Sequence, residues 1–223
     1  NTMANLDFEN FSFHEHDDAV TVLYGKRYKF TINKRDLEEI DSQVKIHSQS
    51  LEFPSISEKK ATNKVNRLID AGLSEMVHTI NGKKVIFIDE YSDIPLIGSG
   101  EFGVVDRETN VLELKPMTGC NLNCIYCSVD EGVNEKEYDI LVDPYYLAGV
   151  ALDIASQKEH DVEFNIGPHG EPLLYPFLEE LIRELSRSHK TNTISLNTNG
   201  TLLTKNVIDK LKQAGLSRIN LSI

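Results

Sequence analysis

Residues 161–200, "DVEFNIGPHGEPLLYPFLEELIRELSRSHKTNTISLNTNG", decide the fold class of the second half of the chain. The segment begins with "DVEFNIG", whose alternating apolar residues are typical of a strand. The helical stretch "PFLEELIRELSRSH" follows, and "TISLNTNG" gives a second strand. In the helical stretch the apolar residues share one face: Phe177, Leu178, Leu181, Ile182 and Leu185. A strand, a helix and a strand in this order predict a parallel pair joined by a right-handed crossover.

The same alternation extends in both directions from this segment. On its N-terminal side "VLELKP" predicts a strand, and "DPYYLAGVALDIASQK" predicts a helix with Asp143 as N-cap and Pro144 at its first position. On its C-terminal side "TKNVIDKLKQAG" predicts a helix that ends at Gly215, and "LSRINLSI" predicts a fourth strand. Residues 111–223 therefore predict an α/β fold with a parallel sheet, truncated so that its remaining strands follow Ile223.

Residues 1–110 lack this regular alternation of strands and helices, and they predict a small α+β accessory domain. "AVTVLYGKRYKFTI" predicts a hairpin around Gly25, and "SEKKATNKVNRLIDAG" predicts a helix capped by Ser57 and ended by Gly72. "MVHTINGKKVIFID" then predicts two strands joined by a tight type I′ turn at Asn81–Gly82. A helix followed by a hairpin is similar to a winged-helix module, and the alternative is a simple packing domain.

Composition excludes several classes of protein. No apolar run reaches the roughly 18 residues that a membrane helix needs, and the N-terminus lacks a secretory signal. A small, odd and clustered set of cysteines favours the reducing cytoplasm over a disulfide framework. The net charge of −12 argues against electrostatic binding of nucleic acid by the protein surface as a whole. It does not exclude a local basic face, because acidic and basic residues nearly balance over residues 57–90.

The stretch "GCNLNCIYCS" contains all three cysteines of the chain, Cys120, Cys124 and Cys127, spaced C-x3-C-x2-C. Thiolates bind soft metals, and four of them complete a tetrahedral zinc site or a four-iron cluster. Three thiolates leave one iron of a four-iron cluster open to an outside ligand, and the close spacing favours this interpretation. The alternatives are a zinc site with His169 as the fourth ligand, or coincidental thiols.

Four motifs together carry a resemblance to a known family. "CNLNCIYC" matches the C-x3-C-x-aromatic-C motif of radical S-adenosylmethionine (radical SAM) enzymes, and "GPHGEPLLYP" is similar to their Gly-Gly-Glu-Pro segment, with His169 in place of the first Gly. "LNTNGTLLT" resembles the third strand end of the branch with molybdopterin-synthesis and peptide-modifying members. "GLSRINLSI" resembles the fourth strand. The resemblance covers residues 111–223 and implies the first four or so strands of a (β/α)6 barrel.

The resemblance implies a function. Cys120, Cys124 and Cys127 would hold a [4Fe–4S] cluster whose open iron chelates S-adenosylmethionine (SAM). Reductive cleavage of SAM would give a 5′-deoxyadenosyl radical that abstracts hydrogen from a substrate, in an oxidoreductase or transferase reaction. An electron donor of the flavodoxin or ferredoxin type is implied, and the substrate would be a peptide, a tRNA or a cofactor precursor. The implied SAM contacts are Tyr126, Gly167, Gly170, Glu171, Pro172, Asn197, Thr198, Asn199 and Ser222.

A second hypothesis comes from another class of protein. In it, the cysteines bind zinc and stabilise a winged-helix-like module that binds nucleic acid or peptide without catalysis. A hybrid is also consistent with the sequence, with the N-terminal half presenting a peptide or tRNA to the radical site. Iron and sulfide content distinguishes the enzyme from the zinc module.

Overall fold

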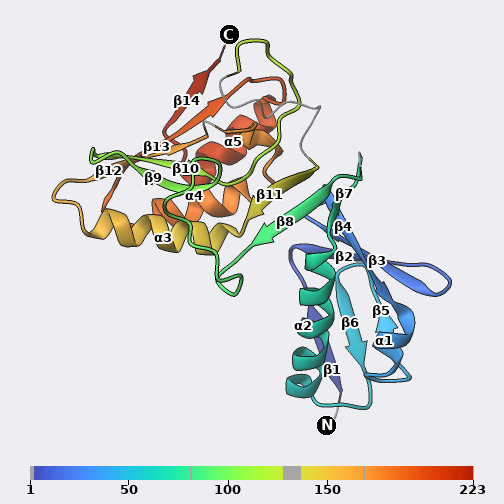
Figure 1. The fold of residues 1–223 in the computed structure, drawn as a ribbon. Helices are drawn as coiled ribbons and strands as arrows, with labels where there is room; N and C mark the ends of the chain where they lie inside the picture. Colours follow the sequence, from blue (N-terminus) through green and yellow to red (C-terminus); the bar gives the residue numbers. More distant parts are fainter. Residues whose placement is uncertain (1–2, 81, 128–136, 168, 223) are drawn as a thin grey trace. The chain divides into compact units, whose positions relative to one another are not determined.

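The computed structural model describes residues 3–80, 82–127, 137–167 and 169–222, and the chain forms two compact units, Asn1–Ile86 and Phe87–Ile223 (Figure 1). The sequence-based boundary near residue 110 falls inside the second unit. It lies between β9 (Gly103–Asp106) and β10 (Val111–Lys115), two strands that pair with each other antiparallel. In the described part of the chain, no helix combines the length and hydropathy that crossing a membrane requires.

The first unit contains two antiparallel sheets. The smaller has the order β1-β6-β5, with β1 (Ala4–Asp7), β6 (Ser50–Phe53) and β5 (Lys45–Ile46). In the larger, neighbouring strands follow the order β8-β7-β4-β3-β2. Its members are β2 (Phe11–Glu15), β3 (Ala19–Tyr24), β4 (Tyr28–Asn33), β7 (Val77–His78) and β8 (Lys84–Ile88). The hairpin predicted around Gly25 is confirmed, because β3 pairs with β4 on either side of it.

Two helices are described in the first unit, the short α1 (Lys34–Glu38) and the long α2 (Glu58–Ser74). One face of α2 is buried and contacts β1 and β4, with Ala61, Val65, Ile69 and Gly72 inward. The prediction that Gly72 lies just past the helix end is wrong. Gly72 lies within the helix, where a Cβ would stand 2.1 Å from Phe30 Cδ2, so the residue permits close packing.

The hairpin after α2 does not have the tight turn that the sequence predicted. Val77 pairs with Lys84, and His78 N donates to Lys83 O, so the register leaves residues 79–82 as the connection. Asn81 itself lies outside the described residues. Strand β7 also pairs with β4, and the hairpin therefore extends a sheet; the winged-helix resemblance is not confirmed.

The second unit confirms the predicted alternation of strands and helices. Its sheet has the order β14-β13-β12-β10-β9, in which β10, β12, β13 and β14 are parallel and β9 is an antiparallel edge. The further strands are β12 (Val162–Ile166), β13 (Thr191–Thr198) and β14 (Arg218–Leu221). The helices are α3 (Pro144–Ser156), α4 (Leu178–Ser186) and α5 (Lys205–Ala214). Crossovers of one hand that always step to the next strand place their helices on the same face.

The two faces of this sheet differ in chemistry because the register aligns like residues across strands. The helix-covered face is apolar and fully buried, with Leu112, Leu114, Phe164, Ile166, Ile194 and Leu196. The opposite face carries a row of polar residues, Glu113, Asn165, Ser195 and Arg218, and beyond it the pair Asn197 and Asn220. The sheet thus presents a polar wall on the side away from the helices.

Two short elements complete the second unit. The strand β11 (Tyr138–Val142) runs antiparallel to the residues that follow β10, with Met117 opposite Leu141. A single 3₁₀ turn, Pro172–Leu174, precedes α4. Neither was predicted, and both border the segment that carries the cysteines. Closure of the sheet into a barrel stays a prediction.

Candidate cofactor site at the carboxyl ends of the strands

The cysteine loop leaves β10 from a firmly held starting point. Thr118 is buried, its amide donates to Ile140 O at 3.0 Å, and its Oγ1 accepts from Ile140 N at 2.9 Å. Val142 N donates to Pro116 O at 2.9 Å. These bonds fix residues 116–118 against β11, so the loop begins at a defined place two residues before Cys120.

Cys120 is the half-buried member of the cysteine set that contacts other parts of the site. Its Sγ accepts from Leu122 N at 3.4 Å and from Asn199 Nδ2 at 3.8 Å. Burial raises the pKa of the Cys120 thiol, and the hydrogen bond from Leu122 opposes that shift. A coordinated metal ion deprotonates such a thiol outright.

Cys124 and Cys127 lie at the two ends of one turn. Cys127 N donates to Cys124 O at 3.0 Å, and Cys127 and Tyr126 are exposed. A hydrogen bond to the Cys124 side chain raises the pKa of Tyr126. The SAM contact implied for Tyr126 therefore concerns an exposed turn between two thiols.

The three cysteine thiols suit a four-iron cluster, and one of their sulfurs, Cys120 Sγ, already accepts two N–H hydrogen bonds. Such N–H donors to sulfur tune cluster thiolates. Among the described residues no three His, Cys, Asp or Glu side chains converge as metal ligands, which holds for iron and for zinc alike. The half-buried His169 is accordingly in no converged zinc set.

The segment after β12 packs its backbone directly against the residue before Cys120. Glu171 N donates to Gly119 O at 2.9 Å. Gly170 has a φ of 61°, and a Cβ there would lie 2.4 Å from Gly119 O, so glycine is required for this approach. Gly167, with a φ of 96°, donates its amide to Leu114 O at 3.0 Å. The backbone of the Gly-x-x-Gly-Glu-Pro segment therefore packs against the start of the cysteine loop.

Glu171 is almost completely buried, at 1% exposed, and its carboxylate is occupied by protein donors. Oε1 accepts from Thr198 Oγ1 at 2.5 Å and from Leu173 N at 3.0 Å, and Oε2 accepts from Asn199 N at 2.8 Å. The carboxylate thus joins the end of β12 to the end of β13. In this arrangement it acts as a brace between strand ends, and the SAM contact that the resemblance implies for Glu171 stays a prediction.

Asn121 and Thr201 belong to the site and were missed by the sequence analysis. Asn199 Nδ2 donates to Asn121 Oδ1 at 2.9 Å, and Asn121 Nδ2 donates to Thr201 Oγ1 at 2.8 Å. Asn199 Oδ1 accepts from Thr201 N and Oγ1 at 3.0 and 2.7 Å. Both missed residues stand inside the quoted motifs "CNLNC" and "LNTNGT", and amide side chains there were the available signal. This network ties the cysteine loop to the end of β13.

The remaining predicted contacts lie at the same edge of the sheet. Pro172 is buried at the start of the 3₁₀ turn. Asn197 Oδ1 accepts from Asn220 Nδ2 at 2.8 Å, across β13 and β14. Ser222 is exposed just after β14, with its amide bonded to Thr198 O at 2.9 Å. The described strand ends therefore bring the predicted residues together along one edge.

Charged groups on the polar wall of the sheet have partners within the protein. Arg218 bonds Glu163, which also accepts from Ser195 Oγ at 2.7 Å. Arg107 pairs with Glu113 at 3.0 Å. Lys115 is 5% exposed, its Nζ donates to Gly100 O at 2.6 Å, and burial lowers its pKa. A large apolar ligand would remove water from these polar groups without giving them hydrogen bonds, so the wall favours polar ligands.

Comparisons with known proteins agree on the second half of the chain. Residues 114–223 match the family described as the Radical SAM superfamily. The chain is 39% identical over 214 residues to uncharacterized protein MJ0103 of Methanocaldococcus jannaschii, a match covering 93% of this chain and 48% of that protein. Over 117 residues it is 31% identical to a GTP 3',8-cyclase of Clostridium botulinum, covering 52% of this chain and 35% of the cyclase. The cyclase of Peptoclostridium acidaminophilum is 33% identical over a stretch with the same coverage.

The chain thus spans about half the length of the first of these relatives and about a third of the cyclases. No solved structure matches it. The matched segment begins at Leu114, six residues before Cys120, and contains all of the strand ends described above. Through residues 114–223 the chain belongs to the radical SAM superfamily, whose members are enzymes that use a [4Fe–4S] cluster and S-adenosylmethionine.

Proposed function

We propose that this chain carries the cluster-binding and SAM-binding part of a radical SAM enzyme. Cys120, Cys124 and Cys127 would hold the cluster, and SAM would take the iron that they leave open. When bound, these groups supply a 5′-deoxyadenosyl radical that abstracts hydrogen from the substrate. The observation that carries the proposal is the tie of Cys120 to both neighbouring strand ends, through Gly119 O to Glu171 N and through its own sulfur to Asn199.

The protein's own task in this proposal is to orient the cysteine loop. Glu171 holds the ends of β12 and β13 at a fixed separation, because its carboxylate accepts from three groups on both sides. Its side chain would act on SAM indirectly, as a positioning group. Backbone groups between Gly167 and Pro172 would then meet the methionine end, where the glycines leave room.

The other proposed SAM contacts follow from their places on the same edge. Asn197, Thr198 and Asn199 stand at the end of β13 and would meet SAM mainly through backbone groups, and Ser222 offers a hydroxyl after β14. Tyr126 would contribute backbone groups from the exposed turn between two cysteines. The cluster loop and these strand ends would together exclude water from the reacting atoms.

The substrate is proposed only by class. The relatives named GTP 3',8-cyclase match this chain over 35% of their own length, which supports common radical chemistry. The match does not carry the substrate of the cyclases over to this chain. The polar wall of the sheet favours a polar substrate, such as a peptide, a tRNA or a cofactor precursor. An electron donor of the flavodoxin or ferredoxin type, further barrel strands beyond Ile223, and a cytoplasmic setting complete the proposal.

The proposal is tested by purifying the protein without oxygen, reconstituting it, and counting iron and acid-labile sulfide per chain. We expect about four of each. Cys124→Ala should lose most of the bound iron and sulfide, whereas Thr201→Ala should retain them, because Thr201 only supports Asn121 and Asn199. One bound zinc without sulfide would instead favour the zinc-stabilised binding module.

A second measurement concerns the chemistry. The reconstituted wild-type protein, reduced with dithionite and supplied with SAM, should release 5′-deoxyadenosine if the described strands suffice for SAM binding. Because the chain spans about half of the first relative, the same assay on a chain extended past Ile223 is the companion experiment. A reconstituted and extended chain that never cleaves SAM would refute the proposal.

A further inference from the structure

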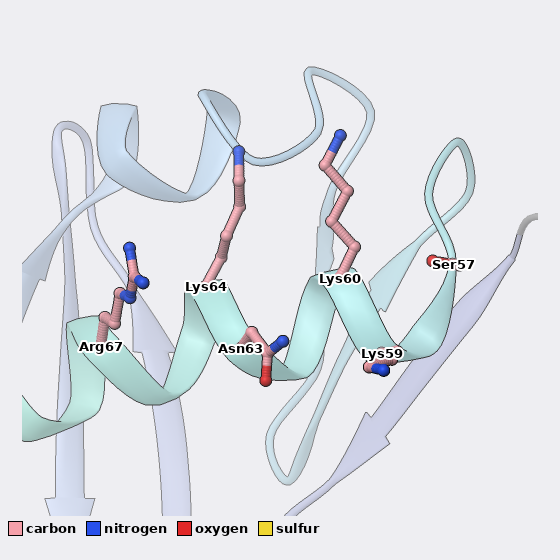
Figure 2. Close-up of a pocket in the computed structure, with 6 residues that line it drawn as sticks. All are labelled: Ser57, Lys59, Lys60, Asn63, Lys64 and Arg67. Atoms are coloured by element: carbon pink, nitrogen blue, oxygen red, sulfur yellow. The ribbon is translucent and has the colours of Figure 1, made fainter.

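The outer face of α2 carries a basic surface that the proposed radical chemistry does not use. Figure 2 shows Lys60, Lys64 and Arg67 rising from one edge of the helix, with Lys59 and Asn63 on its near side. Together with Ser57 these residues line an open cavity of about 330 Å³. All six lining residues are exposed, on the side of α2 opposite its buried stripe.

The four cations of this surface have no acidic partner within the described ranges of the chain. Neither an ion pair nor a side-chain hydrogen bond involves Lys59, Lys60, Lys64 or Arg67 among those residues. The acidic residues Glu58 and Asp70 belong to the same helix but do not line the cavity.

Several cations elsewhere in the described chain are paired, as Lys34 is with Glu15 and Lys45 with Glu52. The chain has 35 acidic and 23 basic residues, so partners for cations are abundant. Four adjacent unpaired cations repel one another and are relieved by a bound anion.

The lining residues have the chemistry of phosphate contacts. Lys and Arg, the amide of Asn, the hydroxyl of Ser and the N-terminus of a helix are the groups that contact nucleic-acid phosphates. Ser57 at the N-cap makes no side-chain capping bond, which leaves its hydroxyl available to a ligand. Three of the four cations are lysines, which bind phosphate as point charges, and the fourth is an arginine, whose planar fork binds phosphate bidentately.

The same surface lacks what other anionic partners would need. Its six lining residues include no aromatic or aliphatic side chain. A docked peptide normally requires such an anchor, and sequence-specific recognition of single strands relies on bases stacked on aromatic side chains. From Lys59 to Arg67 the helix rises about 12 Å, which spans about three or four phosphates of one strand at about 3.4 Å of axis each.

We infer that the α2 face of Lys59, Lys60, Lys64 and Arg67 binds the phosphate backbone of a nucleic-acid strand without reading its sequence. The net charge of −12 confines such binding to this local face, because the rest of the protein repels a polyanion. The inference concerns the first unit and stands apart from the proposed radical chemistry.

The test is fluorescence anisotropy of the 223-residue protein with a labelled stem-loop RNA, and with a DNA of the same sequence, over a range of salt concentrations. Four phosphate contacts predict a slope of log K against log salt of about −3. Lys60→Glu with Lys64→Glu should lower affinity about tenfold or more at low salt and reduce the slope by about 1.5. The matched control, Lys205→Glu with Lys212→Glu on α5, makes the same change in net charge and should retain binding.

The same experiment contains the results that would overturn the inference. They are no binding of either nucleic acid at low salt, equal binding by the Lys60 and Lys64 variant, and competition by polyglutamate as strong as competition by RNA. The last result would assign the face to acidic peptides. If the glutamate variant loses helix content by circular dichroism, Lys60→Gln with Lys64→Gln replaces it, and unchanged binding by that variant overturns the inference.

Discussion

The role of Glu171 as a brace makes a quantitative prediction. Replacing Glu171 by Gln keeps the shape of the side chain but changes one carboxylate oxygen into an amide that donates. Oε1 has two donors, Thr198 Oγ1 and Leu173 N, so the Gln carbonyl should take that place. The new side-chain NH2 group then faces Asn199 N, which is also a donor. The backbone N–H of Asn199 therefore loses its acceptor.

The expected loss can be estimated from these contacts. A hydrogen bond to a charged group contributes about 1.5–3 kcal/mol, and a buried donor left unpaired costs a similar amount. Glu171→Gln breaks one such bond, so we expect the free energy of unfolding to fall by about 2–3 kcal/mol. Glu171→Ala removes the acceptor of all three donors and should cost about 4 kcal/mol or more.

The measurement is urea denaturation of wild type and variants, monitored by far-ultraviolet circular dichroism. The control is Glu159→Gln, an exposed carboxylate near the start of β12, which should change stability by less than about 0.5 kcal/mol. If Glu171→Gln behaves like the Glu159 control, the carboxylate does not hold the strand ends. The positioning role proposed for Glu171 would then be wrong.

Three further substitutions test other parts of the structure. Gly72→Ala puts a methyl group 2.1 Å from Phe30 Cδ2 and should cost about 1–3 kcal/mol, measured by urea denaturation. Burial raises the pKa of Asp143, so the folded chain binds the carboxyl proton more tightly than the unfolded chain does. The protein therefore loses stability as pH rises from the unfolded pKa through the folded pKa. Asp143→Asn should remove that loss, measured by urea denaturation at acidic and neutral pH. Burial lowers the pKa of Lys115, so stability should rise as pH passes from the folded pKa to the unfolded one, and Lys115→Met should abolish the rise in alkaline denaturation curves.

Two of these three substitutions have a matched control, and all three have a refuting outcome. Ala71→Gly in the exposed neighbouring position controls for helix propensity, and a Gly72→Ala variant as stable as wild type would mean that Phe30 does not pack there. Asp153→Asn on the outer side of α3 should leave the pH dependence intact. Identical pH profiles for wild type and the Asp143 or Lys115 variant would contradict the assigned burial effects.

The parallel core of the second unit could be predicted because each of its elements is long and strongly patterned. The strand β13 and the helix α4 follow their periods without interruption, and Asp143 caps α3 as its sequence position indicated, accepting from Tyr145 N and Tyr146 N. The strands β9 and β11 could not be predicted. They are short, and each is defined by its pairing, β9 with the nearby β10 and β11 with the residues after β10, rather than by its own pattern.

The candidate site shows a similar limit. The cysteines and the motif residues could be found because their spacing lies within short stretches of sequence. The brace of Glu171 depends on Thr198 and Asn199, which lie 27 and 28 residues away, and on burial that only the folded chain creates. Local sequence therefore indicated the chemistry of the site but not the hydrogen bonds that hold this carboxylate between the two strand ends.

The role of each motif residue follows from the partners of its hydrogen bonds. Side chains with several internal bonds, Glu171, Thr198 and Asn199, hold the strand ends and the cysteine loop in register. The exposed groups, Cys127 and Ser222, make few such bonds in the described structure. A side chain already satisfied by protein donors has little to offer a ligand, whereas backbone groups beside glycine remain accessible. Ligand contacts at this edge should therefore be made mainly by the backbone, and the polar side chains should act by placing it.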